Sequence, residues 1–307
     1  MLDLSIIIVN WNTRDLLLKC LGCVYNAQRS LTMEVIVVDN HSNDESVDAA
    51  RQSFPQTRFI ENPANYGFAK ANNQGIRQAQ GRYLLLLNSD AFVHEEALTN
   101  MVQFMDAHAD TGAGGCRLFF EDGSLQRSCF SFPTLLTEFW QLTWLDRFFP
   151  RSRTFGKYRM TYWDMTDSHP VDAVMGACLI LRKEALDQIG LLDEQFFMFS
   201  EEIDLCYRLK QAGWLVRYIP HASAVHLWGG SSSQVKEETF LHLYRSRIRF
   251  FRKHYGMWTT CLYKGVLFLG SLLRVILAGI SRILRGENEE SLKGRHYRRL
   301  LISLWSM

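Results

Sequence analysis

Three carboxylates, Glu201, Glu202 and Asp204, lie within four residues at the predicted start of a helix. Like charges at this spacing raise the pKa of at least one carboxyl group, whereas the positive end of a helix lowers the pKa of others. One of the three could therefore serve as a general base that removes a proton from an attacking hydroxyl group. Acidic residues also complement the dipole at the start of solvent-exposed helices, so the cluster alone leaves both interpretations open.

Polar side chains also follow two apolar runs near the N-terminus. Asn10 and Asn12 come after the first run, and Asp39 and Asn40 come after the second. Carboxylate and amide groups at the end of a buried strand can bond to a nucleobase or ribose held at the sheet edge. An Asp-Asn pair after a strand is also ordinary turn chemistry. The pattern is compatible with a nucleotide site and with a structural turn.

A third cluster, Asn88-Ser89-Asp90, follows four consecutive leucines, and His226 lies just ahead of two glycines far along the chain. Asp90 could hold Mg²⁺ or Mn²⁺ against a diphosphate, because a hard cation that keeps positions for phosphate oxygens needs only one or two protein carboxylates. Such a metal would offset the charge that builds on a leaving diphosphate. His226 could ligate the same metal or contact the diphosphate. A turn or helix cap at Asp90 and a structural role for His226 are the alternatives.

Alternating strand and helix patterns must position these clusters. Continuous apolar strands separated by helices indicate an α/β fold with a mostly parallel central sheet covered by helices on both faces. Ligands of such sheets bind beyond the carboxyl ends of the strands, so the clusters that follow strands should line one edge. The predicted strands are Ser5–Val9, Glu34–Val38, Arg58–Ile60, Tyr83–Leu87, Ala173–Leu181 and Trp214–Ile219. The predicted helices are Thr13–Gln28, Glu45–Gln52, Phe68–Gln78, a helix that begins near Lys183, Leu205–Ala212 and the chain after about Glu237.

Composition and charge limit the class of protein. With 307 residues, of which 47% are hydrophobic and 21% charged, the chain can bury the core of one large α/β domain with an appendage. The net charge of +2 conceals an asymmetry, since residues 245–307 carry 13 Lys and Arg but 3 Asp and Glu. We expect this basic tail to face an anionic surface. No nucleic-acid-binding module accompanies the charges, so a nucleic acid is not the expected partner.

The N-terminus and the cysteines bear on the cellular compartment. Residues 1–9 contain neither a basic region nor a small-residue cleavage site, which predicts a first strand rather than a signal peptide and a protein that begins in the cytosol. Seven irregularly spaced cysteines argue against a disulfide framework. Cys20 and Cys23 match C-x-x-C without a second pair, which favours thiols packed on the first helix over a redox or metal site.

Two segments depart from the α/β pattern. Residues 128–163 contain 11 aromatic residues in 36, as expected of the core of an inserted lobe or of an apolar acceptor groove near a membrane. Lys264 and Arg274 enclose nine uncharged residues, whereas a membrane-spanning helix needs about 20. We expect an interfacial amphipathic helix and peripheral attachment to an anionic cytoplasmic leaflet, with an ordinary packed helix as the alternative. The expected domains are 1–236, which includes the aromatic insertion, and a basic helical region at 237–307.

Taken together and in this order, the polar segments resemble the inverting GT-A glycosyltransferases of family 2, which includes bacterial rhamnosyltransferases and other surface-polysaccharide enzymes. Each motif is modest, but seven in the correct order are specific. The resemblance covers about residues 4–256. Its motifs are Ser5-Ile-Ile-Ile-Val-Asn-Trp-Asn12, Val37-Val-Asp-Asn-His-Ser42, Asn65-Tyr-Gly-Phe-Ala-Lys-Ala-Asn-Asn73, Leu86-Leu-Asn-Ser-Asp90, Gly176-Ala-Cys-Leu179, Phe196-Phe-Met-Phe-Ser-Glu-Glu-Ile-Asp-Leu-Cys206 and His226-Leu-Trp-Gly-Gly-Ser231.

The resemblance implies the GT-A, or nucleotide-diphospho-sugar transferase, fold and a metal-dependent, inverting transfer of a sugar from a nucleotide-diphosphate donor. The acceptor would be a hydroxyl group of a glycan or of a lipid-linked acceptor in cell-surface polysaccharide synthesis, and dTDP-rhamnose is the donor suggested by analogy. The resemblance also implies that Asp39 contacts the base, that Asn65, Gly67 and Asn72 shape the nucleotide pocket, and that Asp90 binds the metal. The donor site is completed by the remaining amides at the predicted edge, which are Asn10, Asn12, Asn40 and Asn88.

Two positions depart from the family pattern. The family's catalytic base usually sits in a Glu-Asp pair, and the matching position here reads Glu201-Glu202. Glu202 therefore takes the place of the aspartate with one more methylene, and Asp204 is the alternative base. The family's Asp-x-Asp metal motif has Asn88 in its first position, which leaves Asp90 to hold the ion.

Two other classes of protein share parts of this pattern. A non-catalytic protein could keep the nucleotide-sugar pocket without turnover. A sugar-phosphate nucleotidyltransferase also uses an α/β sheet and a metal, but it would be expected to carry a Gly-rich phosphate loop with Arg or Lys after the first strand. Asn10-Trp11-Asn12 stands at that place instead.

Overall fold

The computed structural model describes residues 2–28, 30–227, 229–230, 232–285 and 292–307. The chain forms two compact units. One comprises Met1–Phe132 and Asp164–Gln234, and the other comprises Pro133–Trp163 and Val235–Met307. Most of the aromatic segment, which we expected as an insertion of the catalytic domain, thus belongs to the same unit as the C-terminal helices.

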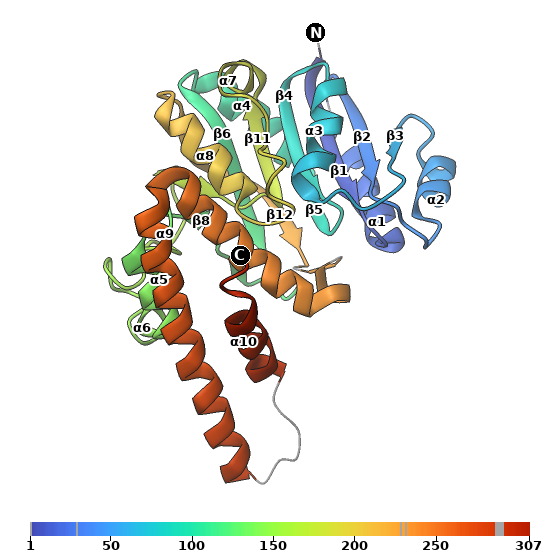
Figure 1. Ribbon diagram of the computed structural model, residues 1–307. Coiled ribbons are helices and arrows are strands. Elements are labelled where there is room, and N and C mark those ends of the chain that lie inside the picture. Colours follow the sequence, from blue (N-terminus) through green and yellow to red (C-terminus); the bar gives the residue numbers. More distant parts are fainter. Residues whose placement is uncertain (1, 29, 228, 231, 286–291) are drawn as a thin grey trace. The chain divides into compact units, whose positions relative to one another are not determined.

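The first unit is built on a mixed ten-stranded sheet. Its strands are β1 (Leu2–Asn10), β2 (Met33–Asp39), β3 (Arg58–Glu61), β4 (Gly81–Asn88), β5 (Ala91–Val93), β6 (Thr111–Phe119), β7 (Leu125–Gln126), β9 (Pro170–Val171), β11 (Cys178–Arg182) and β12 (Leu215–His226). The order along the sheet is β3-β2-β1-β4-β11-β6-β12-β5, with β7 paired to β6 and β9 paired to β12 (Figure 1). Neighbours from β3 to β4 are parallel, as are β6 and β12, whereas β11 runs antiparallel to both β4 and β6.

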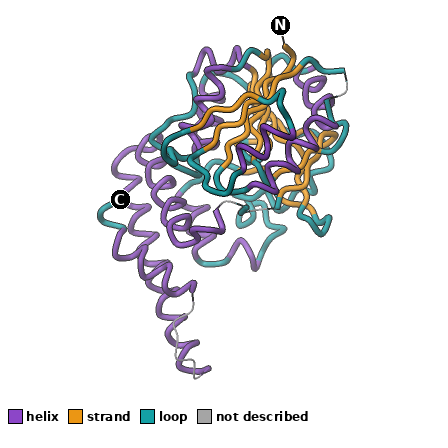
Figure 2. Tube along the Cα trace, turned by 90° about the vertical axis from the view of Figure 1, so that its right-hand side faces the viewer, coloured by secondary structure: helices purple, strands orange, loops and turns teal. Residues whose placement is uncertain are grey.

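Helices cover both faces of this sheet (Figure 2). Ile6 and Ile8 of β1 pack in one core cluster with Leu17 and Met101, whereas Ile7 faces the opposite side. There a Cβ at Gly75 would lie 2.6 Å from Cγ2 of Ile7, so the helix that carries Gly75 packs against the strand backbone at close range. Each buried Ile or Leu contributes about 1.5–3 kcal/mol. The helices are α1 (Arg14–Asn26), α2 (Ser46–Ser53), α3 (Phe68–Gln78), α4 (Ala97–Ala107), α7 (Lys183–Ile189) and α8 (Glu201–Gln211).

The single strand predicted over Ala173–Leu181 is wrong. The segment forms β10 (Ala173–Val174), which pairs with β8 (Cys129–Phe130) in a separate small sheet, and β11, which enters the large sheet. The apolar run is continuous because both strands are buried, so hydrophobicity alone did not reveal the break. Gly176 lies at this break, next to the side chain of Glu202.

The second unit is helical and includes α5 (Leu135–Leu142), α6 (Leu145–Phe148), α9 (Lys236–Arg285) and α10 (Leu292–Ser303). Gly256 has a φ of 81° and bends α9, a conformation that glycine adopts without steric cost. Arg247 is buried and bonds to the Tyr158 hydroxyl over 2.6 Å, and its Nε lies 3.6 Å from Oε1 of Glu138. The hydroxyl bond and the nearby carboxylate offset part of the cost of burying this charge.

Candidate active site

The parallel strands bring three predicted residues to one edge. In the sheet register Asn10 of β1 pairs with Asp39 of β2, and Val9 pairs with Asn88 of β4. Asn10 Nδ2 donates to Asp39 Oδ1 over 2.8 Å, and both side chains are buried. The two clusters that follow β1 and β2 in the sequence are therefore one hydrogen-bonded group.

Ser42 completes this group and holds Asp39 in place. Its amide donates to Asp39 Oδ2 over 2.8 Å, and its hydroxyl donates to Oδ1 over 2.6 Å. Asn12 lies at the rim with a φ of 51°, and its Oδ1 accepts from the Asn43 amide over 2.8 Å. The carboxylate of Asp39 is thus oriented by Asn10 at the end of β1 and by Ser42 in the loop after β2.

Gly67 connects the sheet edge at which Asp39 and Asn40 lie to the segment before the acidic cluster. Asn65 Oδ1 accepts from the Gly67 amide over 2.9 Å, and Asn40 Nδ2 donates to the Gly67 carbonyl over 3.1 Å. Gly67 has a φ of +82°, and a Cβ there would lie 2.4 Å from the carbonyl oxygen of Phe197. The Phe68 amide donates to that same carbonyl over 2.7 Å. Only glycine fits this approach.

Asn72 and Asn73 lie next to each other on α3 but make different bonds. Asn72 is buried and donates to the Phe68 carbonyl one turn earlier over 2.9 Å. Asn73, the last residue of the motif at 65–73, donates to the Leu192 carbonyl over 2.8 Å and accepts from the Leu192 amide over 3.1 Å. The second asparagine therefore anchors the loop that leads to the acidic cluster.

The acidic cluster begins after two strained residues. Phe199 and Ser200 have φ values of 67° and 64°, which non-glycine residues seldom adopt. Glu201 is buried, and its burial, followed by the charge of Glu202, raises the pKa of Glu201 well above its ordinary value. Glu202 is half-buried, and its Cβ lies 3.6 Å from the position that a Cβ would take at Gly176.

Asp204 faces away from solvent. Its side chain is fully buried, and its Oδ2 accepts from Arg208 Nε over 2.9 Å one turn along α8. The same guanidinium donates to the carbonyls of Ile189 and Leu191. The arrangement ties α8 to the end of α7.

Asp90 and His226 lie next to each other where β12 pairs with β5, because His226 pairs with Ala91. His226 Nε2 lies 3.4 Å from Asp90 Oδ1, and the Gly230 amide donates to Asp90 Oδ2 over 2.8 Å. Burial raises the pKa of Asp90, but the adjacent His226 side chain and the bond from the Gly230 amide outweigh burial, so the pKa of Asp90 lies below its ordinary value. Asn88 Nδ2 lies 3.4 Å from the same His226 nitrogen. Two members of the predicted motif at 226–231, Trp228 and Ser231, lie outside the described residues.

Gln126 is a site residue that sequence reasoning missed. It is buried on β7, and its Oε1 lies 2.7 Å from Nδ1 of His226. Its Nε2 donates to the His226 carbonyl over 3.3 Å. Gln126 lies 100 positions from His226 and follows no motif, so no signal in the sequence could have paired the two.

Backbone contacts connect the acidic cluster to the metal-binding candidates. The Asn88 amide donates to the Ala177 carbonyl over 3.0 Å, and Ala177 follows Gly176, beside which Glu202 lies. Asp90 is two residues beyond Asn88. The contacts therefore place Glu202 and Asp90 at the same edge of the sheet.

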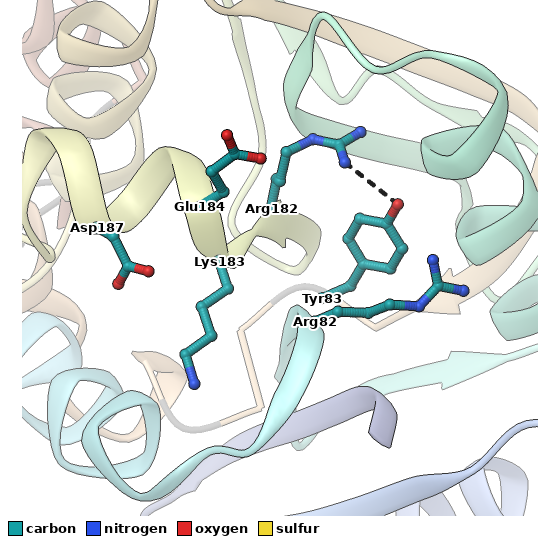
Figure 3. A pocket seen from close by; sticks show the side chains of 6 residues that line it. All are labelled: Arg82, Tyr83, Arg182, Lys183, Glu184 and Asp187. Carbon is teal, nitrogen blue, oxygen red and sulfur yellow. Dashed lines mark hydrogen bonds between the residues drawn. The ribbon is translucent and has the colours of Figure 1, made fainter. Parts of the chain in front are cut away.

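A hollow of about 290 Å³ lies at the opposite edge and is not this site (Figure 3). It opens where β4 begins and β11 ends. Lys183 Nζ there donates to the Ala79 carbonyl over 3.1 Å, and Arg182 donates to the carbonyls of Met105 and His108 and to the Tyr83 hydroxyl. Its cations are already bonded to the protein, which leaves them fewer donors for an anionic ligand such as a diphosphate.

Comparison with known proteins identifies the family of the chain. A family model described as glycosyl transferase family 2 matches residues 5–190. An N-acetylglucosaminyl-diphospho-decaprenol L-rhamnosyltransferase of Mycobacterium tuberculosis is 28% identical in an alignment of 258 residues, which covers 79% of this chain and 83% of the relative. Rhamnosyltransferase WbbL of Escherichia coli is 26% identical over 169 residues, 52% of this chain and 61% of the relative.

Solved structures show the same fold. The mannosyltransferase PcManGT from Pyrobaculum calidifontis, solved with GDP-Man and Mn²⁺, has a TM-score of 0.53 at 15% identity and covers 100% of this chain and 87% of that one. GalNAc-T7, solved with UDP, GalNAc and Mn²⁺, has a TM-score of 0.54 at 17% identity and covers 80% of this chain and 47% of that one. The GT-A fold with a C-terminal helical region that we expected is confirmed. The chain is a glycosyltransferase and belongs to glycosyl transferase family 2.

Proposed function

We propose that the protein transfers a sugar from a nucleotide-diphosphate donor to an acceptor hydroxyl group with inversion at the anomeric carbon. The observation that carries the proposal is the shared sheet edge at which Asp39, Asp90 and Glu202 are linked through neighbouring backbone contacts. In a direct displacement the base and the leaving group act on opposite sides of the reacting carbon. We therefore assign the base to α8 and the diphosphate site to the end of β4.

The donor nucleotide is assigned to the group around Asp39. Asn10 and Ser42 fix the direction of its carboxylate, so its remaining lone pairs can accept from a base or ribose at little cost in side-chain entropy. Asn40, Asn65 and Gly67 hold the adjoining loop. We assign Asn12, Asn72 and Asn88 to the same donor site as boundary residues.

Asp90 and His226 fit a bound Mg²⁺ or Mn²⁺. A carboxylate oxygen and an imidazole nitrogen face each other, and both are accepted ligands of Mn²⁺. Asn88 Oδ1 is buried without a hydrogen-bond partner among the described residues, which leaves one further oxygen close to the pair. Within the described part of the chain no three His, Cys, Asp or Glu side chains gather as a complete metal site, so the diphosphate would supply the remaining ligands. When bound, the metal stabilises the negative charge on the leaving diphosphate.

Glu202 is the proposed base, because its two acidic neighbours are committed elsewhere. Asp204 neutralises Arg208 in the protein interior. Glu201 is buried, and its burial, together with the charge of Glu202, raises its pKa and so favours the protonated form, which cannot accept a proton. Glu202 alone of the three is half-exposed, and it lies beside Gly176, whose missing side chain leaves room for an acceptor hydroxyl group.

The identity of the substrates is proposed from the relatives. The names of two relatives specify rhamnosyl transfer, and one specifies a diphospho-decaprenol acceptor. We propose dTDP-rhamnose as the donor and a glycan or lipid-linked hydroxyl group as the acceptor, in cell-surface polysaccharide synthesis on the cytoplasmic side of the membrane.

The surface of α9 supports contact with that membrane. From Met257 to Ile280 every exposed residue is uncharged, including Trp258, Leu269 and Ile276, at 88%, 67% and 50% exposure. By length and composition part of α9 is apolar enough to cross a bilayer, with a mean hydropathy of 1.8. This differs from the expectation that charges interrupt the apolar run.

Arg274 accounts for the difference. Its guanidinium points into the second unit and donates to the carbonyls of Gln141 and Leu142 and to the Tyr297 hydroxyl. The apolar surface therefore continues past it. We propose that α9 lies in the plane of the interface, because α10 packs beside it and exposes Arg295 and Arg298, which favour an anionic headgroup layer over hydrocarbon (Figure 1).

The test of the proposed reaction is a panel of nucleotide-diphosphate sugars with Mg²⁺ or Mn²⁺. Each sugar is incubated with a lipid-linked acceptor, and the release of free nucleoside diphosphate is measured together with the anomeric configuration of the product by NMR. We expect metal-dependent release with one donor and an inverted product. Metal-independent turnover, or a product with retained configuration, would contradict the mechanism.

A further inference from the structure

Gln126 and His226 are joined by two contacts whose directions are fixed by chemistry. The His226 backbone carbonyl can only accept, so the Gln126 atom 3.3 Å from it must be the amide nitrogen. Gln126 Oε1 is then the atom 2.7 Å from His226 Nδ1. An oxygen that can only accept requires a proton on that ring nitrogen.

A neutral imidazole carries one proton, and two acceptors, Gln126 Oε1 at Nδ1 and Asp90 Oδ1 at Nε2, compete for it. A proton on Nε2 would leave the Nδ1 lone pair against the Gln126 oxygen at 2.7 Å, which is repulsive. A proton on Nδ1 makes a short bond there and leaves Nε2 facing Asp90 at the longer distance of 3.4 Å. The short contact with Gln126 therefore determines the tautomer, because hydrogen-bond energy falls with distance and 3.4 Å lies beyond the usual range.

With Nδ1 protonated, the Nε2 lone pair and the Asp90 carboxylate point toward the same region. Two acceptors that face each other at this range are stabilised by a cation between them. The orphan oxygen of Asn88 lies beside them. The buried amide of Gln126 thus prepares the ring for a metal without contacting the metal region itself.

We propose that Gln126 is a positioning residue that keeps the proton of the neutral His226 ring on Nδ1 and so presents the Nε2 lone pair, together with Asp90, to a divalent cation. This inference rests on the metal role in the proposed function. It adds Gln126, which belongs to no sequence motif, to the site, and it assigns to Gln126 the choice of the His226 tautomer.

The tautomer can be read in the metal-free protein. The full chain is labelled with ¹⁵N-histidine and studied at about pH 8.5, well above the usual pKa of histidine. Two-bond ¹H–¹⁵N correlation spectra assign the ring proton, and the His226→Gln spectrum identifies the signal. We expect Nδ1–H in the unmodified protein and a shift of the proton toward Nε2 in Gln126→Met, which preserves length and loses both polar atoms.

Metal affinity is the second measurement, made by EPR titration with Mn²⁺ alone. We expect Gln126→Met to bind Mn²⁺ about 10–100-fold more weakly. Gln126→Glu loses the donor to the His226 carbonyl but keeps an acceptor at Nδ1, so it should retain both the Nδ1–H ring and the Mn²⁺ affinity, which a merely structural role of the amide would not explain. If Gln126→Met does not fold, the unmodified protein and Gln126→Glu still decide the question.

Three results would overturn the role of Gln126. They are an Nε2–H ring in the unmodified protein, an unchanged Mn²⁺ affinity in folded Gln126→Met, and a loss of Mn²⁺ affinity in folded Gln126→Glu. Failure of the unmodified protein to bind Mn²⁺ would instead overturn the metal part of the proposed function. The two failures are therefore distinguishable.

Discussion

Arg208 Nε donates to Asp204 Oδ2 over 2.9 Å, and neither side chain is more than 18% exposed. The same arginine holds two backbone carbonyls at the end of α7. Asp204 therefore neutralises a guanidinium whose other bonds fix the chain just before the loop to α8. Glu202, two residues earlier, lies beside Gly176 at the sheet edge. One acidic cluster thus divides into a structural carboxylate and a candidate base.

Asp204→Asn should lower stability and leave the chemistry intact. Removing one partner of a buried ion pair costs about 3–5 kcal/mol because the other charge stays buried and unpaired. Urea unfolding measures the loss, and turnover is compared at a temperature where both proteins are folded. A large fall in turnover with unchanged stability would assign the base to Asp204.

Glu202→Gln should have the opposite profile. The amide cannot accept the acceptor's proton, so we expect turnover to fall about 10²–10⁴-fold while donor affinity and unfolding free energy stay near those of the unmodified protein. Steady-state kinetics with a fixed acceptor and isothermal titration with the nucleoside diphosphate separate the two quantities. Glu202→Asp, which restores the residue usual in the family at this position, serves as the matched control and should retain measurable turnover. Near-normal turnover in Glu202→Gln would remove this residue from the role of base.

Glu201 should make stability depend on pH. Burial and the charge of Glu202 raise its pKa in the folded protein well above the ordinary 4.5, so the folded state binds a proton that the unfolded state releases. Its contribution to stability is complete below the unfolded pKa and is lost as pH rises toward the folded pKa. Glu201→Gln has no proton to lose, so its advantage over the unmodified protein should grow as pH rises from about 5. Urea unfolding across this pH range tests the trend, with Glu184→Gln on an exposed position of α7 as the control. An advantage that stays constant with pH would contradict the assignment.

The sequence predicted the parts of the fold that follow simple periodicity. β1, β2 and α3 were placed within a few residues, since each is a clean apolar run or helical pattern. The edge that joins Asn10 to Asp39 followed from the rule for parallel strands. The mixed direction of the sheet at β11 did not follow, because an antiparallel strand buried on both faces has the same apolar pattern as a parallel one.

Contacts between distant segments were also beyond sequence reasoning. The pairing of Gln126 with His226 and the inward direction of Arg274 depend on tertiary packing, which leaves no local pattern. The grouping of residues 133–163 with the C-terminal helices had no signal in the sequence either, since their aromatic content indicates burial without identifying the surface that buries them.

Gly67→Ala should destabilise the protein and weaken donor binding. The new Cβ would lie 2.4 Å from the Phe197 carbonyl oxygen, and a φ of +82° is strained for alanine. The loop must shift, which moves the groups that Asn40 and Asn65 hold. Thermal unfolding and the KM for the donor report the two effects. Gly22→Ala on α1, where the added Cβ meets nothing within 4 Å, is the matched control and should raise stability by about 0.5–1 kcal/mol. Equal effects of the two substitutions would refute the steric argument.

The apolar face of α9 should hold the protein on anionic membranes. Trp258, Leu269 and Ile276 are exposed in the second unit, and each side chain buried in the interface would contribute about 1.5–3 kcal/mol. Replacing all three with glutamine should abolish sedimentation with vesicles that contain phosphatidylglycerol, at low and at physiological salt. Leu136 and Phe148, at 64% and 73% exposure, lie in the same unit outside α9, and their double replacement with glutamine is the matched control.

The basic residues make a separate contribution that salt should reveal. Arg295 and Arg298 of α10 are exposed, and each basic residue near an anionic surface is worth about 1 kcal/mol at physiological ionic strength. Replacing both with glutamine should weaken binding to phosphatidylglycerol vesicles while leaving the weaker binding to uncharged phosphatidylcholine vesicles unchanged. Raising the salt concentration should remove this difference between the two proteins, because screening eliminates the electrostatic part and spares the apolar part. If the protein binds neither kind of vesicle, in-plane attachment is contradicted. It is also contradicted if alkaline carbonate cannot extract the protein from native membranes, because that result indicates a helix that crosses the bilayer.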